Sequence, residues 1–311
     1  MRSPEHDALL LDLDGVVYAG DGAVPGAPEA LARLRADGVA LRFVTNNAFR
    51  TPQQVADKLV SVGVAATAEE VLASPRAAVG LLRGRFGLDD GDRVAVAGGQ
   101  GLLQAVTEAG LTAEHVSRLD GTPAALVQGF SPATTWEDLA TASRLVAQGV
   151  PWVATNLDAT IPTAWGIAPG NGLLVRAVAE AAGRRPDAVA GKPGPHLFTV
   201  AAQSCGAVTP LVVGDRLDTD VAGGRAAGQR TALVLTGVHG VLDALRAEPS
   251  HRPDRLLQDL GDLWPGPGHD AADALTRGLH RAWAELDAGL SDDERDEALS
   301  RWSRQLSPAP G

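Results

Sequence analysis

Cysteine, tyrosine and lysine are nearly absent from this chain of 311 residues, which has one cysteine, one tyrosine and two lysines. The single cysteine, Cys205, excludes an intramolecular disulfide and a cysteine-ligated metal cluster, and it fits a reducing cytoplasm. Cys205 lies in an apolar helical stretch, which favours a packing role over a nucleophilic one. No two histidines have the spacing of a metal site.

Long apolar runs are also missing. No stretch is long enough to span a bilayer, and the short apolar run near the N-terminus contains acidic residues, unlike a signal peptide. The chain has 27 basic and 38 acidic residues, which give a formal net charge of −11. This charge opposes binding to nucleic acid or to an anionic membrane. We therefore expect a cytoplasmic protein with neither partner.

The composition that remains is typical of a globular protein. Apolar residues make up 45% of the chain and aromatic residues 4%, so the core is built mainly from Val, Leu and Ala. The length allows about two domains. Strand-like and helix-like stretches alternate along most of the chain, which predicts an α/β fold with a parallel sheet.

One stretch, ALLLDLDGVVY at residues 8–18, organises the prediction. Ala8–Leu11 is a continuous apolar run and predicts a buried strand of a parallel sheet. Asp12 and Asp14 follow at the carboxyl end, where such sheets bind ligands, and strand alternation would point both to the same side. Two like charges this close favour a bound Mg²⁺. The alternative is a solvated, aspartate-rich turn.

Further polar groups follow other strands. The predicted strand at residues 39–44 leads into Thr45-Asn46-Asn47. The predicted strand at residues 210–213 leads into Gly214-Asp215, and Asp220 follows five residues later. Lys192 follows Gly191. In a parallel sheet the strand ends open on one side, which would bring carboxylates, a hydroxyl, amides and an ammonium together. Phosphoryl transfer with Mg²⁺ uses such groups.

The order of elements predicts an insertion. We expect strands at residues 8–11, 39–44, 94–97, 124–127, 151–155, 210–213 and 231–235, and helices at 28–37, 52–63, 74–86, 102–110, 134–148, 172–182, 195–205 and 219–227. Residues 17–27 predict a loop or flap, and Thr51 and Ser74 predict N-caps. The expected domains are a Rossmann-like core (1–77 and 190–262) and a smaller α/β cap (78–189) inserted into it.

Residues 263–311 form a helical C-terminal extension in this scheme. A linker at residues 264–268 would precede helices at 270–290 and 292–305, which Trp283 and Trp302 would dock onto the body. The extension has three open interpretations: a surface for a partner, the contact of a homodimer, or a buttress of the core.

The set LLLDLDGVVY, VTNN, AGKPGP and VVGDRLDTD resembles, in order, the four motifs of the haloacid dehalogenase-like phosphatases. The second asparagine of TNN and the large insertion between the second and third motifs resemble class IIA, the NagD-like and p-nitrophenylphosphatase-like enzymes. The resemblance covers roughly residues 7–240. It implies a Rossmann-like core with a cap and Mg²⁺-dependent hydrolysis of phosphate esters.

The resemblance also implies roles for individual residues. Asp12 matches the nucleophile that forms an aspartyl-phosphate, and Asp14 matches the general acid and base. Thr45 and Asn46 match the phosphoryl-binding pair, Asn47 an adjoining contact, and Lys192 the charge-stabilising lysine. Asp12, the Asp14 carbonyl and Asp215 would ligate Mg²⁺, and Asp220 would orient a metal-bound water or Lys192. The alternative for Asp220 is a charge partner of a helix N-terminus.

Substrate choice is expected to depend on the cap. Asn156 and Asp158, in the stretch NLDATIP, match the family's N-x-D and are candidate substrate contacts; the alternative is a turn held by Asn and Asp side chains. Gly129 and Phe130 are weaker candidates. The run Gly98–Gly101 lacks the G-x-G-x-x-G spacing of a dinucleotide site.

We therefore expect a cytoplasmic, Mg²⁺-dependent phosphatase of small phosphorylated metabolites. The composition is rich in Ala, Gly and Arg and poor in Lys, which indicates a GC-rich bacterial genome. Together with the class IIA resemblance, this favours glycerol 3-phosphate or a similar polyol phosphate. Phosphoglycolate, nucleotides, sugar phosphates and pyridoxal phosphate remain open. The alternatives of another class are a phosphotransferase, a D-x-D nucleotide-sugar transferase and a non-catalytic phosphate-binding protein.

Overall fold

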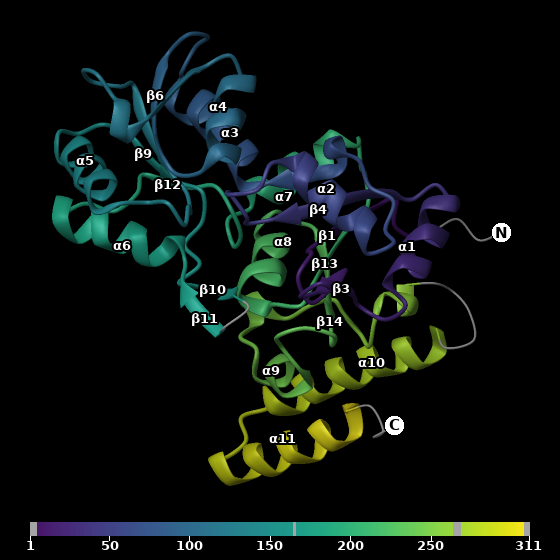
Figure 1. Cartoon of the computed structure of the whole chain (residues 1–311). Helices are drawn as coiled ribbons and strands as arrows, with labels where there is room; N and C mark the ends of the chain where they lie inside the picture. The colour runs from purple at the N-terminus through teal and green to yellow at the C-terminus, as the bar shows by residue number, and fades with distance from the viewer. Residues whose placement is uncertain (1–4, 164–165, 264–268, 308–311) are drawn as a thin grey trace. The chain divides into compact units, whose positions relative to one another are not determined.

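The computed structural model describes residues 5–163, 166–263 and 269–307 (Figure 1). The chain divides into two compact units, which we describe separately. Unit 1 comprises Met1–Val44, Asp57–Ala66 and Ala201–Gly311, and unit 2 comprises Thr45–Ala56 and Thr67–Val200. The predicted domain boundaries stay a prediction, and unit 2 is larger than the predicted cap. The predicted linker at residues 264–268 lies outside the described residues.

Unit 1 contains the parallel sheet that the first motif predicts. Its elements are β1 (Ala8–Leu11), β2 (Tyr18–Ala19), β3 (Gly22–Ala23), α1 (Ala27–Ala36), most of β4 (Ala40–Thr45), the second half of α2 (Pro52–Ser61), the end of α7 (His196–Ser204), β13 (Pro210–Gly214), a π-helical turn (Leu217–Val221), α8 (Ala222–Ala226), β14 (Arg230–Val234), α9 (Val241–Arg246), β15 (Arg255–Leu257), α10 (His269–Leu286), α11 (Asp292–Leu306) and the short 3₁₀ turns Pro249–His251 and Leu260–Leu263.

The strands of this sheet run parallel in the order β15-β14-β13-β1-β4. All four residues of β1 are buried, as expected for a central parallel strand that is covered on both faces. Leu11 lies opposite Val213 of β13 and Phe43 of β4. The carboxyl ends of the three strands therefore meet at one edge, which confirms the predicted Rossmann-like core.

A small hairpin, β2–β3, occupies part of the predicted flap at residues 17–27. Lys58 of α2 holds it: the Nζ atom donates to the carbonyl of Gly20 at 2.8 Å and lies 4.2 Å from the centroid of the Tyr18 ring. The hairpin was not predicted as strands because two-residue strands have too few positions for an alternating pattern. One of the two lysines thus fixes the segment after the first motif.

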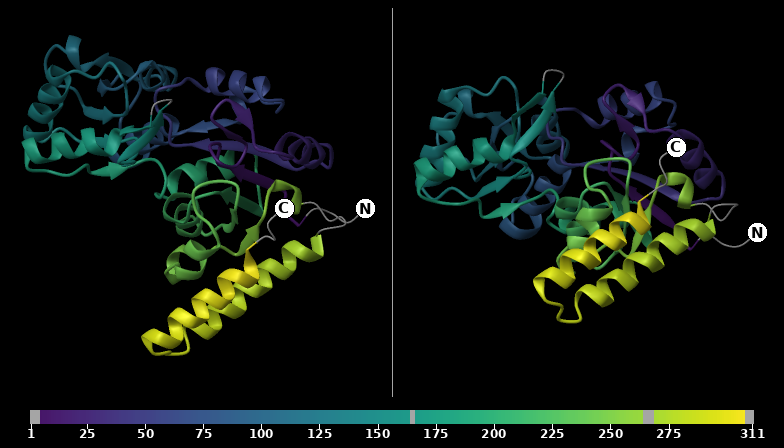
Figure 2. Two further views of the ribbon diagram at one scale, coloured as in Figure 1. Left: turned by 60° about the horizontal axis from the view of Figure 1, so that its bottom comes forward. Right: turned by 90° about the horizontal axis from the view of Figure 1, so that it is seen from below.

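The C-terminal helices pack on unit 1 (Figure 2). Helix α10 contacts β15 and α9, and α11 contacts α9 and α10. Trp283 is buried in the same hydrophobic cluster as Leu233 and Leu256 of the sheet, and its indole nitrogen donates to the carbonyl of Ala244 at 2.9 Å. Trp302 packs against this cluster and donates to Glu285. The predicted docking by both tryptophans is confirmed, which supports the buttress interpretation.

Unit 2 is a second α/β unit with its own parallel sheet. Apart from the parts of β4, α2 and α7 that it shares with unit 1, its elements are a 3₁₀ turn (Ala68–Glu70), β5 (Val71–Ala73), α3 (Ser74–Phe86), β6 (Arg93–Ala97), α4 (Gln100–Glu108), β7 (Thr112–His115), a second 3₁₀ turn (Val116–Arg118), β8 (Ala125–Gln128), α5 (Trp136–Ala147), β9 (Trp152–Ala154), β10 (Thr160–Thr163), β11 (Gly166–Pro169), α6 (Asn171–Ala182) and β12 (Ala188–Val189).

The parallel strands of unit 2 lie in the order β12-β9-β8-β6-β7. Helices α3 and α4 pack together on one face and α5 and α6 on the other (Figure 1). The core combines Trp152 with small and branched residues such as Ala95, Leu126 and Val178. The sequence prediction found the three central strands β6, β8 and β9 but missed β7 and β12 at the edges and the antiparallel hairpin β10–β11.

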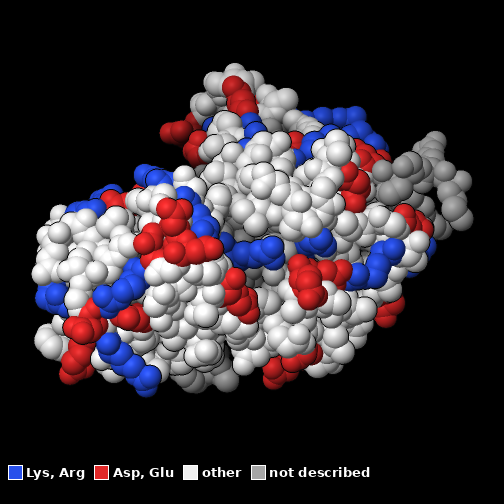
Figure 3. Space-filling model, turned by 90° about the horizontal axis from the view of Figure 1, so that it is seen from above, with Lys and Arg blue, Asp and Glu red and all other residues white. Residues whose placement is uncertain are grey.

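Two further features concern the whole described chain. No helix among the described residues is long and apolar enough to cross a membrane. On the face shown in Figure 3, the acidic and basic side chains are interspersed.

Candidate active site

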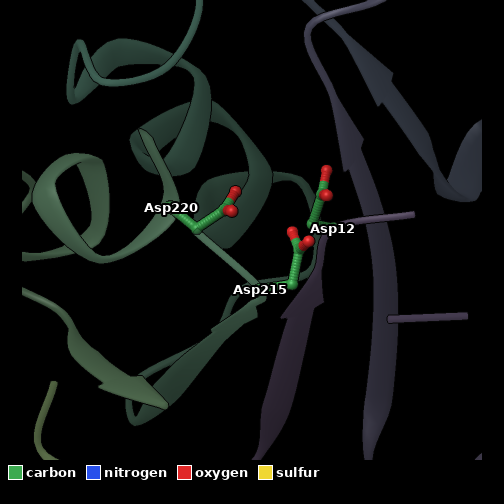
Figure 4. A group of neighbouring side chains, drawn as sticks. All are labelled: Asp12, Asp215 and Asp220. Carbon is green, nitrogen blue, oxygen red and sulfur yellow. The ribbon is translucent and has the colours of Figure 1, made fainter. Parts of the chain in front are cut away.

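Three carboxylates meet at the carboxyl edge of the sheet in unit 1. Asp12 follows β1, Asp215 follows β13, and Asp220 lies in the π-helical turn after Asp215. One oxygen from each lies within 4.8 Å of the others; the side chains of Asp12 and Asp215 extend in the same direction, and that of Asp220 points toward them (Figure 4). Asp215 and Asp220 are 2% and 1% exposed, whereas Asp12 is partly exposed. The group therefore opens to solvent on the Asp12 side.

Two glycines make room for Asp215. A Cβ atom on Gly15 would lie 2.5 Å from Oδ2 of Asp215, and one on Gly237 would lie 2.1 Å from the same atom. Gly15 also has a φ of +80°, which a residue with a side chain rarely adopts. The glycine of the D-x-D-G motif thus serves both the turn and the carboxylate that approaches it.

The loop after β14 also holds Asp215, and the sequence analysis missed it. The backbone amide of Val238 donates to Oδ2 of Asp215 at 2.8 Å, and that of His239 donates to its carbonyl at 3.1 Å. Thr236 donates to the carbonyl of Gly15 at 2.6 Å. The available signal was the run Thr-Gly-Val-His-Gly directly after a strand, a composition typical of backbone close to a site.

Asp220 lies against the strand end because Gly214 has no side chain. A Cβ atom on Gly214 would lie 2.2 Å from the Cβ of Asp220. The backbone amide of Arg216 donates to Oδ2 of Asp220 at 3.2 Å. The predicted helix at residues 219–227 was wrong in its first part, because a π-helical turn precedes α8. Such turns are frequent at functional sites.

Asp218, on the same turn, is bound differently. Arg216 donates to both of its carboxylate oxygens, at 3.0 and 2.7 Å. Burial raises the pKa of Asp218, but the hydrogen bonds and charge of Arg216, with the charge of His239, outweigh burial and leave the pKa below its ordinary value. The negative charge of Asp218 is therefore balanced by Arg216 within the turn. Asp218 does not belong to the group formed by Asp12, Asp215 and Asp220.

Asp14 is exposed on the turn after β1. Its backbone bridges to Tyr18, and the amide of Gly15 donates to the carbonyl of Tyr18 at 2.8 Å. Among the described residues, the carboxylate group that could hold a metal comprises Asp12, Asp215 and Asp220 without the Asp14 side chain. The predicted metal contact of Asp14 was assigned to its backbone carbonyl, and it stays a prediction.

The donor set fits Mg²⁺. Three carboxylates that share one small volume repel each other unless a cation lies among them, and carboxylate oxygens are the ligands that Mg²⁺ prefers. The burial of Asp215 and Asp220 strengthens this argument, because water screens buried charges poorly.

The other predicted residues belong to unit 2. Thr45 ends β4, is 7% exposed and accepts the backbone amide of Asn47 through Oγ1 at 3.1 Å. Asn47 accepts the backbone amides of Phe49 and Arg50 through Oδ1 at 2.9 and 3.0 Å. These bonds shape the turn that leads into α2, which begins at Pro52 after Thr51, as predicted. Asn47 is thus a turn residue in this structure.

Lys192 is 3% exposed, and its ammonium lies 5.9 Å from the centroid of the Phe198 ring. Both its backbone groups bind the side chain of Asn46. Asn46 also donates to Asp158, and Asn156 donates to the carbonyl of Asn46 at 2.8 Å. The structure therefore brings together four predicted residues of unit 2: Asn46, Asn156, Asp158 and Lys192.

The predicted N-cap role of Ser74 is wrong. Ser74 is the first residue of α3, and its hydroxyl donates to the carbonyl of Asn46 at 2.8 Å. The glycine run at residues 98–101 packs tightly: a Cβ atom on Gly99 would lie 2.9 Å from the Phe49 ring, and one on Gly101 would lie 2.8 Å from the Arg50 carbonyl. These glycines allow close packing of α4.

A parallel α/β sheet with clustered carboxylates at its carboxyl edge fits a metal-dependent enzyme, and sequence comparison identifies the family as the haloacid dehalogenase-like hydrolases. The profile of the haloacid dehalogenase-like hydrolases matches residues 9–112, and a HAD-hydrolase-like profile matches residues 189–263. The chain belongs to this family.

Individual relatives make the assignment more specific. The chain is 44% identical over 259 residues to the D-glycerol 3-phosphate phosphatase of Mycobacterium tuberculosis. The aligned region covers 83% of this chain and 71% of the relative. It is 35% identical over 241 residues to the acid sugar phosphatase of Staphylococcus aureus, covering 77% and 90%.

A solved structure is similar over nearly the whole chain. The glycerol phosphate phosphatase of M. tuberculosis in complex with magnesium has a TM-score of 0.84 and 39% identity, covering 97% of this chain and 99% of the other. The p-nitrophenyl phosphatase of Archaeoglobus fulgidus has a TM-score of 0.75 and 29% identity, covering 84% and 98%. The predicted resemblance to class IIA phosphatases is confirmed.

Proposed function

We propose that glycerol 3-phosphate, or a similar small polyol phosphate, is the substrate of this chain, which is a Mg²⁺-dependent phosphatase of small phosphate esters. The observation that carries the reaction class is the group formed by Asp12, Asp215 and Asp220. The substrate proposal is supported by the similarity to glycerol phosphate phosphatases. Sugar phosphates are the second candidate, because acid sugar phosphatases are also relatives.

Asp12 is the proposed nucleophile. Its carboxylate attacks the phosphorus atom, and the bond between phosphorus and the ester oxygen breaks. Asp14 gives its proton to the leaving alkoxide, so the alcohol departs neutral. Asp14 then takes a proton from water, the water oxygen attacks phosphorus, and the bond to Asp12 breaks to release inorganic phosphate. The exposure of Asp14 suits a residue that meets both the leaving alcohol and water.

Asp12, Asp215 and the Asp14 carbonyl would hold Mg²⁺, with Asp220 beside them. When bound, the metal would offset the negative charge of the carboxylates and of the phosphoryl group. The glycines around Asp215 and the loop after β14 fix that carboxylate before metal binds.

The residues of unit 2 provide the proposed phosphate and substrate contacts. Thr45 and the Asn46 segment would donate to phosphoryl oxygens, and Lys192 would balance their charge. Asn156 and Asp158 are the proposed substrate-selecting positions, although both also hold the turn after β9. Asn47 is the proposed adjoining contact.

Location and assembly complete the proposal. We place the protein in the cytoplasm because its one cysteine fits a reducing compartment. A homodimer is a further proposal, which sedimentation or light scattering would test.

Phosphate release from a panel of esters tests the function. The panel holds glycerol 3-phosphate, a sugar phosphate, phosphoglycolate, pyridoxal phosphate, a nucleotide and p-nitrophenyl phosphate, each with Mg²⁺ and with EDTA. We expect Mg²⁺-dependent release with glycerol 3-phosphate preferred. Preference for another ester would reject the proposed substrate but keep the class. Transfer to added sugars without free phosphate would identify a phosphotransferase, and no reaction at all would favour a binding role.

A further inference from the structure

The side chain of Asn46 hydrogen-bonds to the peptide groups on both sides of Lys192. Its Oδ1 atom accepts the backbone amide of Lys192 at 2.8 Å, and its Nδ2 atom donates to the carbonyl of Lys192 at 3.1 Å. The Nδ2 atom also donates to the carboxylate of Asp158, at 3.1 and 3.2 Å from its two oxygens. The two amide protons thus have two acceptors, and the amide oxygen has one donor.

Gly191, the residue before Lys192, gives the Asn46 side chain room for these hydrogen bonds. A Cβ atom on Gly191 would lie 2.3 Å from Oδ1 of Asn46 and 2.6 Å from the carbonyl of Thr155. Only glycine at position 191 therefore lets the asparagine approach the backbone of Lys192. The backbone amide of Gly191 donates to that same Thr155 carbonyl at 2.8 Å, which ties the segment to the end of β9.

The backbone of Asn46 is held as firmly as its side chain. Its carbonyl accepts from Ser74 Oγ and from Asn156 Nδ2, both at 2.8 Å. The Oδ1 atom of Asn156 accepts the amide of Asp158 at 3.1 Å, and the carbonyl of Asn156 accepts Nδ2 of Asn171 at 2.8 Å. Ser74, Asn156, Asn171 and Lys192 are all at most 4% exposed. A buried network of mutual hydrogen bonds is rigid, and a broken one is costly.

This hydrogen bonding limits what the Asn46 side chain can do. A phosphoryl oxygen accepts hydrogen bonds, and an asparagine amide has two protons to donate. Both protons already have acceptors on Lys192 and Asp158. To bind phosphate through its amide, Asn46 would have to give up one of these bonds.

We propose that Asn46 is a positioning residue that fixes the backbone of Lys192, and that Asp158 orients the Asn46 amide for this task. The inference rests on the proposed phosphatase function and refines it. The side chain of Asn46 acts on the reaction through Lys192, and Asp158 acts through Asn46.

A swap of the two side chains tests the proposal. The variants are Asn46→Asp, Asp158→Asn and the double variant, assayed for kcat and KM with p-nitrophenyl phosphate and glycerol 3-phosphate. N46D puts two carboxylates face to face and loses the bond to the Lys192 carbonyl, so kcat/KM should fall by about 100-fold. D158N should lower kcat/KM with p-nitrophenyl phosphate clearly less than N46D does, because the amide oxygen that it introduces can still accept from Asn46.

The double variant separates the two roles. Its new asparagine can donate to the new aspartate, so we expect it to recover about tenfold in kcat/KM over N46D, a coupling of ~1.4 kcal/mol. If Asn46 instead donates directly to phosphate, the negative charge at position 46 repels the substrate whatever occupies position 158. A double variant no better than N46D would therefore overturn the proposal.

Gln104→Glu is the matched control. Gln104 Nε2 donates to the Glu108 carboxylate at 2.6 Å on α4 of the same unit. This variant creates the same pair of facing carboxylates away from the proposed site, and its kcat/KM should stay within about twofold of wild type. A control loss as large as that of N46D would assign the N46D effect to general destabilisation and overturn the proposal.

A binding and exchange readout keeps this inference separate from the proposed function. N46D should also weaken binding of inorganic phosphate, measured by calorimetry, and the double variant should restore part of it. In Asn46→Ala, the backbone amide of Lys192 should exchange with solvent at least about tenfold faster than in wild type. If wild type releases no phosphate from any ester, the proposed function fails, and the exchange result still decides whether Asn46 fixes Lys192. An unchanged exchange rate would overturn the inference.

Discussion

The two parallel sheets of this chain have similar architecture and different chemistry at their strand ends. In unit 1, β1 and β13 lead into the carboxylates Asp12 and Asp215. In unit 2, β8 ends in Gln128 and β9 leads into Thr155 and Asn156. Both sheets are parallel, and both have a core of aliphatic residues.

The difference lies in how each group of polar residues is stabilised. The carboxylates of unit 1 share one charge sign and need a cation for full stability. The Asn46 network of unit 2 combines amides, the Ser74 hydroxyl, backbone groups and the single carboxylate of Asp158, and these groups bind one another. A fold therefore provides the sheet edge, and the residues that follow the strands decide whether it binds a ligand or holds the protein together.

Asp12→Asn should have the largest effect, because it removes the proposed nucleophile from the carboxylate group. We expect kcat to fall by about 10⁴-fold or more, with phosphate release from glycerol 3-phosphate as the measurement. Asp37→Asn, at the exposed end of α1, is the matched control and should retain wild-type kcat. Substantial turnover by D12N would exclude Asp12 as the nucleophile.

Lys192→Met tests the charged residue of unit 2. The substitution keeps most of the side-chain volume and removes the ammonium, so kcat/KM should fall by about 10²- to 10³-fold. Lys58→Met, the same change at the other lysine, should cost less than about threefold. Equal losses in the two variants would mean that Lys192 has no special role in charge stabilisation.

Asp215→Asn should weaken Mg²⁺ binding by about 10- to 100-fold while leaving the metal-free protein at least as stable as wild type. The reason is that the variant removes one of three like charges. Thermal unfolding with and without Mg²⁺ measures both effects. A metal-free variant that melts well below wild type would show that Asp215 is held mainly by protein hydrogen bonds.

Among the described residues, burial lowers the pKa of one histidine in each unit, His6 in unit 1 and His196 in unit 2. The unfolded chain takes up these protons first as pH falls below about 6.5, so the free energy of unfolding should decrease there. His6→Gln and His196→Gln should each flatten the dependence between pH 7 and 5, and the double variant more than either. Urea unfolding at several pH values measures this. Unchanged slopes would mean that neither histidine matters.

The contrast between the units also explains what the sequence could predict. The runs ALLL and PLVVG are continuous and apolar, and each leads directly into a carboxylate. The sequence therefore predicts both the strand and the candidate metal ligand that follows it. The position of Asp220 next to Asp215 depends on a π-helical turn and on Gly214, and the support from Val238 depends on a distant loop. Such features arise from contacts between separate segments, which local patterns do not contain.

The Asn46 network shows the same limit more strongly. The motifs identified Asn46, Asn156, Asp158 and Lys192 as polar candidates, but not that they bind each other. Short elements were lost for a different reason. Strands such as β12 and β15, with two and three residues, are stabilised by neighbours in the sheet and have too little pattern of their own.

The scarcity of lysine gives the chain a simple covalent chemistry. Of its two lysines, Lys58 is partly exposed beside the β2–β3 hairpin, whereas Lys192 is 3% exposed. An amine-reactive reagent would therefore acylate Lys58 early, and Lys192 only when its surroundings open. The ratio of the two modified peptides in a mass spectrum would report how often the buried amine becomes accessible, without any engineered label.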